Sequence, residues 1–537
     1  MTNVSVRVVC GNIHLIEFGY DHYNVGMKRV SSGLSPVIAV DRKAAKPLHK
    51  QVYDAFRAMI VTRTLGAGQQ IPSTRALAYE LKVSRIPVLT AYAQLLAEGY
   101  FEARVGAGTF VCSSLPEQQT FPETGSSQSH PVRSGPRHIA KRALLLPPLP
   151  RQETHPWLRG LGPFSVSQAA YDEFPLQIWS SLVMRHCRNS RATDLHYGPA
   201  LGLETLRDAV CTYLRTSRAV RCDPQQVMIV SGSQQALEIS ARVLLDPGDS
   251  AWLEEPGYWL ARHVITASGC RVVPVPVDKE GMNVSAGIKL WRKARLAYVT
   301  PSHQYPLGVT MSASRRFQLL DWAQGTGSWI IEDDYDSEYR YENMPIASLQ
   351  GLDHNSRVIY IGTFSKTVFP SLRLGYVVIP SDLAERFTMV RQAMDVSPAH
   401  LYQAVLNDFM REGHFARHIR RMRILYGERR TALVETIVGE FGSALEVLGA
   451  QAGMHLVATL PKTFRDREIA ASAARKRLWL WPLSPSYIGK NPRQGLILGF
   501  GNTRPEEMPH AVRQLKSILL SHGDLAATKV AQRPSRS

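Results

Sequence analysis

The chain has 537 residues, too many for one ordinary domain, so we expect two or three domains. Hydrophobic residues make up 44% and charged residues 20%, as in ordinary globular proteins, but the formal net charge is +18 and the pI is near 9.7. This excess of positive charge suits a polyanionic partner, and alone it does not distinguish DNA from RNA or an anionic membrane.

Cysteine spacing and hydropathy disfavour several classes of protein. The six cysteines form no CxxC pair and no zinc-ligand spacing, which argues against a disulfide framework or a structural metal. The sequence has no apolar run of about 18 residues and no signal-peptide core, which argues against membrane spanning and secretion. We therefore expect a cytoplasmic protein without a metal, associated with the nucleoid if its partner is DNA.

Composition divides the chain into five segments. Residues 1–41 have no clear period, and Met27 leaves open a downstream translation start, so we expect an extension that is unstructured or not translated. Residues 42–112 are densely periodic, whereas 113–160, rich in Ser, Gln, Pro and His, indicate a linker. Residues 161–520 alternate short apolar segments with amphipathic ones and form the expected body domain. Residues 521–537 are expected to be disordered.

The first periodic segment predicts three helices and a hairpin. Apolar residues from Leu48 to Ile60 fall on one face of a helix that Pro47 can open. Ser73 is placed to cap a second helix, STRALAYEL, and Ser84 a third, SRIPVLTAYAQLLAE. Two short alternating segments, YFEARV and TFV, then flank the glycine turn GAG. This order of elements is that of a winged helix-turn-helix.

The charge of this segment favours DNA as the partner. Residues 42–112 hold ten lysines and arginines against four acidic residues. The candidates for DNA contact are Arg75 in the second helix, Ser84 and Arg85 at the start of the third, and Arg104 and Gly108 in the hairpin. The alternative is a basic three-helix domain that is merely solvated, and a generic helix-turn-helix pattern does not decide between the two.

A resemblance adds to this interpretation. The phrases PSTRALA, VSR, AYAQLLAEGY and the wing GAGTFV resemble the winged-helix head of GntR-type bacterial regulators, over about 65 residues. Ile86 and Pro87 replace the small or hydroxylated residues usual after VSR, which affects the bases that the helix start would contact. The resemblance implies that the head binds double-stranded operator DNA.

The body alternates short apolar strands with amphipathic helices. The expected strands are VMIVSG, SAWLEEP, CRVVPVPV, RLAYVTP, SWIIEDD, RVIYIGTFSK and LGYVVIP. Such alternation predicts an α/β fold with a mainly parallel sheet.

A lysine at the end of one of these strands is a candidate reactive group. In TFSKTVFPSLRLGY, Lys366 could form a Schiff base with an aldehyde cofactor that carries a phosphate. Thr363 and Ser365 offer hydroxyls, and Arg373 offers a guanidinium, to that phosphate. A single lysine after a strand is more often an ordinary surface residue, so the neighbouring segments decide.

An acid lies thirty-three residues upstream of this lysine. Asp333 ends the apolar strand in WIIEDDYDSEYRY, and a carboxylate there could keep the pyridine nitrogen of pyridoxal phosphate protonated. Tyr335 could bond the phenolic oxygen of the same ring. The alternative is a solvated acidic loop, which fits Asp336 and Glu338 better than it fits Asp333.

Two further segments could complete a cofactor site. In MIVSGSQQALEI, the backbone N–H groups of Gly232, Ser233 and Gln234 begin a helix and could hold a phosphate, although this pattern alone is weak. In LEEPGYWLARH, Tyr258 could stack on the pyridine ring, although an aromatic residue after a strand is more often part of a core. The loop that contains His303 would lie along the edge of the cofactor.

Together these segments resemble fold-type I aminotransferases, specifically the body of MocR-type regulators, over about residues 165–515. The matching phrases are HYGPALGLETLRDAV, SGSQQAL, LLDPGD, EEPGY, TPSHQYPLG, IIEDDYDSEYRY and TFSKTVFPSLRLGY. The resemblance implies that pyridoxal 5'-phosphate is held as a Schiff base on Lys366, with Asp333 at the pyridine nitrogen and Tyr335 at the phenolic oxygen. Arg373 and Ser365 would hold the phosphate, and the resemblance also implies a homodimer.

Two departures from the aminotransferase pattern bear on function. Aminotransferases usually have Asn-Pro-x-Gly where this chain has YPLG at 305–308, so the Asn bond to the cofactor is absent or moved to His303 or Gln304. They also keep an arginine before the final strand for the substrate carboxylate, and that position is apolar here, with Arg493 and Arg504 as nearby candidates. Loss of this clamp should impair transamination more than Schiff-base formation.

Three hypotheses follow. The favoured one is a transcriptional regulator that senses pyridoxal phosphate, or an amine or amino acid that reacts with it. The alternative is a working aminotransferase with a DNA-binding appendage, against which the two departures count. A DNA-binding scaffold with an inactive body is disfavoured, because the set of Lys, Asp, Tyr and Arg is complete.

Overall fold

In a computed structural model, the structure describes residues 38–104, 106–113, 138–146, 160–341 and 347–523. The chain divides between Pro136 and Arg137 into two compact units, the first with the predicted head and the second with the predicted body. Most of the predicted N-terminal extension, linker and C-terminal tail lies outside the described residues. Across the described ranges, no helix is both long and apolar enough to cross a membrane.

The head has the predicted winged helix-turn-helix fold. Its helices are α1 (Leu48–Val61), α2 (Thr74–Glu80) and α3 (Arg85–Ala97). Its strands β1 (Gln70–Ile71), β2 (Phe101–Arg104) and β3 (Gly108–Val111) form an antiparallel sheet in the order β1-β3-β2. The sequence predicts only the β2–β3 hairpin. Strand β1 lies between α1 and α2, where the Gln70 side chain donates to the carbonyl of Ala107 at 2.9 Å.

The core of the head is an aromatic cluster. The ring of Phe56 lies 5.5 Å from that of Tyr92 and 5.3 Å from that of Phe101, in edge-to-face geometry that aromatic pairs favour. Ile38, near the end of the predicted extension, is also buried in this core. The packed part of the head therefore begins before residue 42.

The two predicted helix caps differ. Ser73 Oγ accepts a bond from the backbone N–H of Ala76 at 3.2 Å, as expected for an N-cap. Ser84 occupies the N-cap position of α3 but makes no capping bond with its side chain, so the expectation of a second cap bond is wrong. Its exposed hydroxyl is left free for other partners.

The body is built on a mainly parallel eight-stranded sheet, as predicted. Its order is β4 (Val227–Val230), β11 (Gly375–Val378), β10 (Val358–Thr363), β9 (Trp329–Asp334), β8 (Leu296–Val299), β5 (Ser250–Glu255), β6 (Arg271–Asp278) and β7 (Gly281–Met282). Strands β10, β9, β8, β5 and β6 pair in parallel, whereas β11 is antiparallel to both of its neighbours. Periodicity alone does not give strand direction, so the sequence could not single out β11.

Helices cover both faces of this sheet, so most residues of its strands are apolar and buried. In β4, Val227 and Ile229 pack into one buried cluster, and Met228 and Val230 into another. The surrounding helices are α5 (Leu176–Asn189), α6 (Glu204–Arg218), α7 (Ser233–Leu244), α8 (Trp259–Ala267), α9 (Val284–Trp291), α10 (Ala313–Thr326), α11 (Leu349–Leu352), α12 (Ala384–Asp395) and α13 (His400–Arg411), with α4 (Lys141–Leu144) beside α8. When a sheet is buried on both faces, the sequences of its strands are largely continuous apolar runs.

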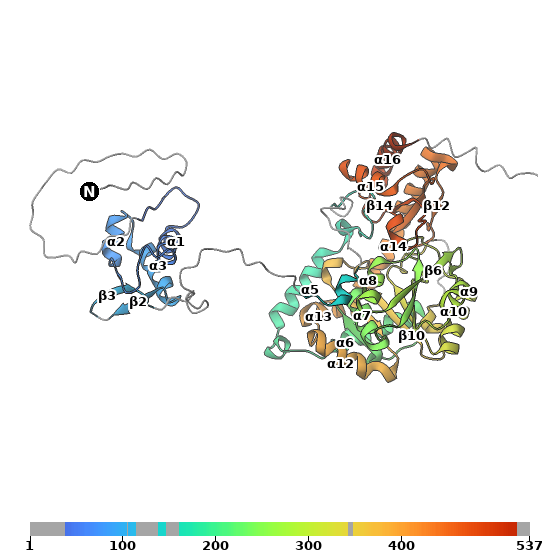
Figure 1. The fold of residues 1–537 in the computed structure, drawn as a ribbon, viewed down its shortest axis with the longest axis horizontal. Helices are drawn as coiled ribbons and strands as arrows, with labels where there is room; N and C mark the ends of the chain where they lie inside the picture. Colours follow the sequence, from blue (N-terminus) through green and yellow to red (C-terminus); the bar gives the residue numbers. More distant parts are fainter. Residues whose placement is uncertain (1–37, 105, 114–137, 147–159, 342–346, 524–537) are drawn as a thin grey trace, which may run out of the picture. The chain divides into compact units, whose positions relative to one another are not determined.

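The long helix α14 (His414–Phe441) leads from the large sheet to a smaller C-terminal part of the body (Figure 1). There an antiparallel sheet has the order β12 (Val447–Leu448), β13 (His455–Thr459), β15 (Gly495–Gly499) and β14 (Trp481–Pro482). Helices α15 (Asp466–Arg475) and α16 (Met508–His522) pack on it. One continuous cluster of buried apolar side chains joins this part to the large sheet.

Candidate functional site

The carboxyl ends of two neighbouring parallel strands bring the predicted acid and lysine to one edge of the sheet. Asp333 lies at the end of β9, in register with Ile361 of β10, and Lys366 follows β10 by three residues. The carboxyl edge of a parallel sheet is where α/β folds bind ligands.

Asp333 is buried and half satisfied. Its side chain is 4% exposed, and Oδ2 accepts a 2.7 Å bond from the Tyr298 hydroxyl. The other oxygen, Oδ1, is buried without a hydrogen-bond partner. Burial raises the pKa of Asp333 to about 7, against the lowering effect of the Tyr298 bond. A buried acceptor oxygen without a donor is costly, and a protonated ring nitrogen is a group that would satisfy it.

Lys366 carries an amine of reduced basicity. Its Nζ donates to the backbone oxygen of Ser167 at 3.0 Å. Burial lowers the pKa of Lys366 to about 8, and the charge of Asp336 opposes this lowering. A lysine with such a pKa is about a tenth neutral amine at pH 7, far more than an ordinary lysine, and the neutral amine is the nucleophile that forms a Schiff base.

Tyr335 belongs to a polar network with His303 and Asp336. Nδ1 of His303 lies 3.1 Å from both carboxylate oxygens of Asp336 and 3.1 Å from the Tyr335 hydroxyl. Because a carboxylate only accepts, Nδ1 carries the ring proton and donates it to Asp336. The Tyr335 hydroxyl therefore keeps its own proton for another acceptor. Asp336 is 2% exposed, so its interpretation as part of a solvated loop is wrong.

A second histidine lies beside this network. The ring of His455 is 4.8 Å from that of His303, and its Nε2 donates to the carbonyl of Pro306 at 3.0 Å. Burial and the neighbouring His303 lower the pKa of His455 to about 3, so it is neutral. His303, Asp336 and His455 hold candidate metal-ligand atoms within 4.8 Å of one another, where the sequence predicted no metal site. Hydrogen bonds within the protein occupy Nδ1 of His303 and Nε2 of His455, whereas Nε2 of His303 is buried without a partner among the described residues.

The candidate phosphate cradle forms where β4 and β11 lie side by side. Gly232 has a φ of 90° and precedes α7, whose first backbone N–H groups, from Ser233 and Gln234, have no acceptor within the helix. Arg373 donates to the carbonyl of Ser231 at 2.7 Å. A Cβ on residue 232 would lie 3.3 Å from the Arg373 guanidinium, so glycine leaves the cradle open.

Two hydroxyls extend the cradle from β10. Thr363 Oγ1 donates to Ser365 Oγ at 3.0 Å and accepts from the Ser365 backbone N–H at 3.2 Å. These groups come from the same loop as Lys366. The helix start, the guanidinium and the hydroxyls together offer the donors that a phosphate dianion requires.

Tyr258 precedes α8 and packs edge-to-face on Tyr305, with ring centroids 5.6 Å apart. Burial and the charge of Asp333 raise the pKa of Tyr258, so its hydroxyl stays protonated. Tyr305 occupies the place of the usual asparagine. The structure therefore replaces an amide at this edge with an aromatic pair.

Several residues of the site carry no clear motif in the sequence. Tyr298 bonds Asp333, Ser167 accepts from Lys366, and Glu254 accepts from the Thr300 hydroxyl at 2.6 Å and from Gln304 at 3.2 Å. Burial raises the pKa of Glu254 to about 7. For Tyr298 and Glu254, the signal that could have revealed them is a polar side chain within a strand predicted to be buried, since such a group needs a partner. Ser167 accepts with its backbone oxygen, so its residue type gives no such signal.

Comparison with known proteins supports both halves. The family "Aminotransferase class I and II" matches residues 164–512, and "Bacterial regulatory proteins, gntR family" matches residues 48–111. The probable rhizopine catabolism regulatory protein MocR of Rhizobium meliloti is 39% identical over 90% of this chain and 96% of its own length. The chain belongs to the MocR-type GntR regulators.

Two further similar proteins are a transcriptional regulator and an aminotransferase. The pyridoxine biosynthesis transcriptional regulator PdxR of Corynebacterium glutamicum is 28% identical over 87% of this chain and 94% of its own length. An archaeal alanine:glyoxylate aminotransferase superposes with a TM-score of 0.67 at 25% identity, over 72% of this chain and 98% of that enzyme. The cofactor of this fold is pyridoxal 5'-phosphate, and the unpartnered Asp333 Oδ1 and open Gly232 cradle fit it.

The candidate carboxylate arginines of this MocR-type regulator have other partners. Arg493 pairs with Glu446 at 3.1 Å, and both side chains are more than half exposed. Arg504 pairs with Asp172 at 3.2 Å, also near the surface. The side-chain amide nitrogen of Gln304 donates to the carboxylate of Glu254 and to the carbonyls of Pro256 and Tyr305. Gln304 is therefore not free to replace the usual asparagine.

The GntR-type head binds DNA, and the structure places the five candidates for this contact on its surface. Arg75 and Ser84 are exposed, and Arg85 Nε donates to Thr74 Oγ1 at 3.1 Å, across the turn between α2 and α3. Arg104 bonds Glu102 at 3.0 Å and lies 4.6 Å over the ring of Phe110. Gly108, with φ of 112°, begins β3.

Proposed function

We propose that this protein is a transcriptional regulator whose body binds pyridoxal 5'-phosphate covalently on Lys366 and senses an effector there. The effector is the cofactor itself, or an amine or amino acid that reacts with it. The observation that carries the proposal is the buried Asp333 Oδ1 without a partner, in a chain that also has a DNA-binding head. That oxygen lies ready for the proton of a pyridinium nitrogen.

Each candidate residue has a role in this proposal. Asp333 holds the ring nitrogen, Tyr335 donates to the phenolic oxygen, and His303 with Asp336 fixes the direction of the Tyr335 hydroxyl. The bound cofactor supplies a carbonyl carbon that exchanges one amine for another. The remaining candidates hold the phosphate and the ring face, namely Gly232, Ser233, Gln234, Thr363, Ser365, Arg373 and Tyr258.

Sensing suits this site better than turnover. Arg493 and Arg504 lie in exposed ion pairs, so no arginine of that segment is committed to a substrate carboxylate. An effector that exchanges with Lys366 acts as a switch only if it binds one state of the body more tightly than another. The relative PdxR is named for regulation of pyridoxine biosynthesis, which supports the cofactor itself as one effector.

We further propose that the protein is a cytoplasmic homodimer associated with the nucleoid. The segment between α5 and α6 exposes two large side chains close together in the chain, with Leu195 82% and Tyr197 77% exposed. Exposed apolar side chains that gather in one region mark a protein interface. A second copy of the chain is the proposed occupant, and a dimer would present two heads to a two-part operator.

The test is DNA binding with and without cofactor. In an electrophoretic shift assay, the affinity of the wild type for DNA from upstream of its own gene should change when pyridoxal phosphate is added. The affinity of Lys366→Ala should not change on this addition. Lys289→Ala, which removes an exposed lysine of α9, is the matched control and should behave as wild type. Identical DNA binding by the wild type and Lys366→Ala in all conditions would refute cofactor-dependent control.

The competing function is a working aminotransferase with an attached head. The complete set of Lys366, Asp333, Tyr335 and Arg373 favours it. Turnover of amino acids with 2-oxo acids at about 1 to 1,000 per second would establish this function instead.

A further inference from the structure

The end of α13, the turn after it and the first part of α14 form the most arginine-rich part of the body. Residues 411–430 contain seven arginines and two glutamates. The cofactor site described above uses none of them. In an ordinary solvated helix, acidic residues would balance most of these charges.

Two of the seven arginines are structural. Arg429 is buried and donates to the carbonyl of Gly501, and Arg430 donates to the carbonyl of Ala450 at 2.7 Å. Both tie α14 to the C-terminal part of the body. The other five are exposed, and we call them the α14 arginine surface: Arg411, Arg417, Arg420, Arg421 and Arg423.

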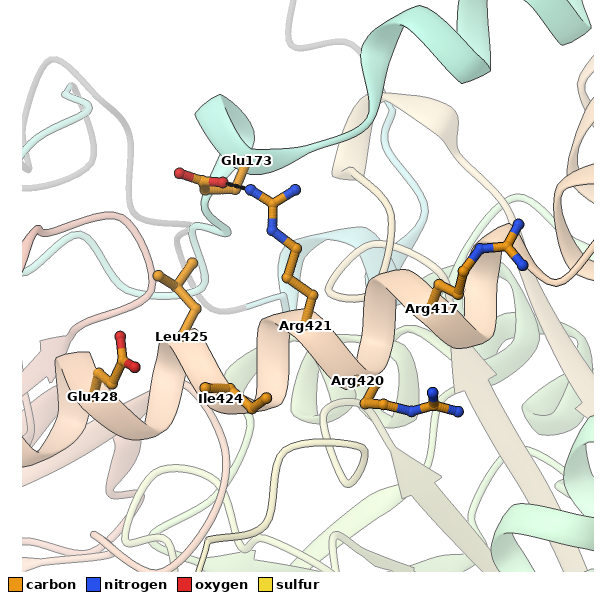
Figure 2. A pocket seen from close by; sticks show the side chains of 7 residues that line it. All are labelled: Glu173, Arg417, Arg420, Arg421, Ile424, Leu425 and Glu428. Carbon is orange, nitrogen blue, oxygen red and sulfur yellow. Dashed lines mark hydrogen bonds and ion pairs between the residues drawn. The ribbon is translucent and has the colours of Figure 1, made fainter.

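Few carboxylates neutralise this surface. Arg421 is paired with Glu173, the contact drawn in Figure 2, but Arg417 donates only to the carbonyl of Glu412 at 3.1 Å and to Nδ1 of His414 at 2.8 Å. Arg420 has no partner among the described residues, and Figure 2 shows its side chain extending away from α14. By contrast, Arg185 on α5 has two carboxylate partners, Asp408 and Glu412.

The shape of the surface suits an extended anion. Arg417, Arg420 and Arg421 are three and four residues apart, so they lie on neighbouring positions of one side of the helix. Together with Glu173, Ile424, Leu425 and Glu428 they line an open hollow (Figure 2). An arginine fork bonds two phosphate oxygens at once and is weakly hydrated, so a row of such forks favours a polyphosphate backbone.

We propose that the α14 arginine surface contacts phosphates of duplex DNA outside the bases bound by the winged helix. This inference rests on the proposed function, since it requires a DNA-bound regulator. The body would thereby add affinity without sequence preference, as phosphate contacts do. Such contacts would also let a change in the body alter how the flanking DNA is held.

The test compares two duplexes bound by the cofactor-loaded full chain. One ends at the limits of the head's footprint on DNA upstream of its own gene, and the other extends it by about 20 bp, two helical turns, on each side. Arg417→Gln/Arg420→Gln should weaken binding of the extended duplex at least about tenfold at low salt and reduce its salt-dependence slope by about 2 for each protomer that contacts flanking DNA. Binding of the short duplex should be unchanged.

Two control variants separate charge from folding. Arg417→Lys/Arg420→Lys keeps the charge and should retain most of the extended-duplex affinity. Arg386→Gln/Arg513→Gln removes two exposed arginines from α12 and α16 and should bind as wild type. Unchanged absorbance of the bound cofactor in all variants checks that the body is folded.

The outcomes distinguish this inference from the proposed function. Equal binding of both duplexes by the wild type and by Arg417→Gln/Arg420→Gln would overturn the α14 contact and leave the regulator intact. Equal weakening on both duplexes would overturn it as well, because the effect would not depend on flanking DNA. Failure of the wild type to bind either duplex would remove the proposed function, and this inference with it.

Discussion

The hydroxyl of Tyr298 donates a 2.7 Å hydrogen bond to Oδ2 of Asp333, and the other oxygen of that carboxylate has no partner in the described parts of the chain. The bond stabilises the charged form of an acid whose pKa burial raises to about 7. In the proposed function, Tyr298 would act on the cofactor through Asp333, by keeping the carboxylate ionised for the ring nitrogen.

Tyr298→Phe should therefore weaken cofactor binding. Loss of the bond raises the pKa of Asp333 further, so less of the carboxyl group is ionised at neutral pH. A hydrogen bond to a charged group contributes about 1.5 to 3 kcal/mol, so the affinity for pyridoxal phosphate should fall about tenfold or more. Spectroscopic titration of cofactor-free protein measures this. Asp333→Asn should lose more affinity than Tyr298→Phe, and wild-type affinity in Asp333→Asn would contradict the role of Asp333.

The pH dependence of cofactor attachment should follow Lys366. Only the neutral amine reacts, and burial lowers the pKa of Lys366 to about 8, so the attachment rate should rise with pH and level off above about pH 8. Asp336→Asn removes the charge that opposes this lowering, so the midpoint should move to lower pH. Stopped-flow absorbance from pH 6 to 10 measures both profiles. A rate that still rises steeply at pH 10, as for an amine with the ordinary lysine pKa of 10.5, would show that Lys366 is not shielded from solvent in this way.

Much of this site could be predicted because its strands begin as apolar runs and the polar site residues follow these runs. With helices on both faces of the sheet, WII before Asp333 and VIYIG before Thr363 mark strand ends, where ligands bind. The glycine turn before Ser233 marks a helix start in the same way. These signals are local, so a single sequence contains them.

The rest depends on contacts between distant segments. Tyr298 and Asp333 are 35 residues apart, and Lys366 meets Ser167 across 199 residues. The hydrophobic periodicity of a sequence does not reveal contacts between such distant residues. Asp336 was misjudged for the same reason, since its burial depends on His303 from another loop. Ser84 has a residue type that suits a helix cap but makes no cap bond. The residue type alone does not say whether the side-chain hydroxyl turns toward the backbone N–H groups of the helix or toward solvent.

In the head, Arg85 should contribute more to operator selectivity than Arg104. Arg85 begins α3, and its Nε donates to Thr74 at the start of α2. Arg104, by contrast, is already paired with the carboxylate of Glu102. Arg85→Ala should reduce the preference for operator over scrambled DNA by about 1 to 3 kcal/mol, and Arg104→Ala should weaken both about equally. Fluorescence anisotropy with both duplexes measures this. An unchanged preference in Arg85→Ala would place base recognition elsewhere in the head.

The two compact units should lose their functions separately. Phe56 is fully buried in the aromatic core of the head, and Phe56→Ala should destabilise the head by about 3 to 5 kcal/mol. DNA binding should be lost while the absorbance of bound cofactor stays at the wild-type level, since the body has its own core. Tyr79→Ala, at an exposed site on α2, is the control and should leave the melting of the head unchanged. Loss of cofactor binding in Phe56→Ala would show that the units are not independent.

A buried ion pair on α6 should govern the stability of the body. Arg218 Nε donates to Asp334 Oδ2 at 2.8 Å, and its Nη2 donates to Ser302 Oγ at 2.9 Å, with both charged side chains nearly inaccessible. Arg218→Met leaves the Asp334 charge buried with only the Tyr360 hydroxyl, at 2.6 Å, to satisfy Oδ2. Removal of one partner of a buried pair costs about 3 to 5 kcal/mol.

The same helix supplies a matched control for this ion pair. Arg215 pairs with Asp223 at 2.6 Å, but both side chains are more than half exposed, so Arg215→Met should cost less than about 1 kcal/mol. Urea denaturation of cofactor-free protein, followed by tryptophan fluorescence, measures both variants. Asp334→Asn in the Arg218→Met background should recover part of the loss, because it removes the unpaired charge. Equal stability of Arg218→Met and Arg215→Met would mean that solvent reaches Asp334, at the end of the strand that carries Asp333.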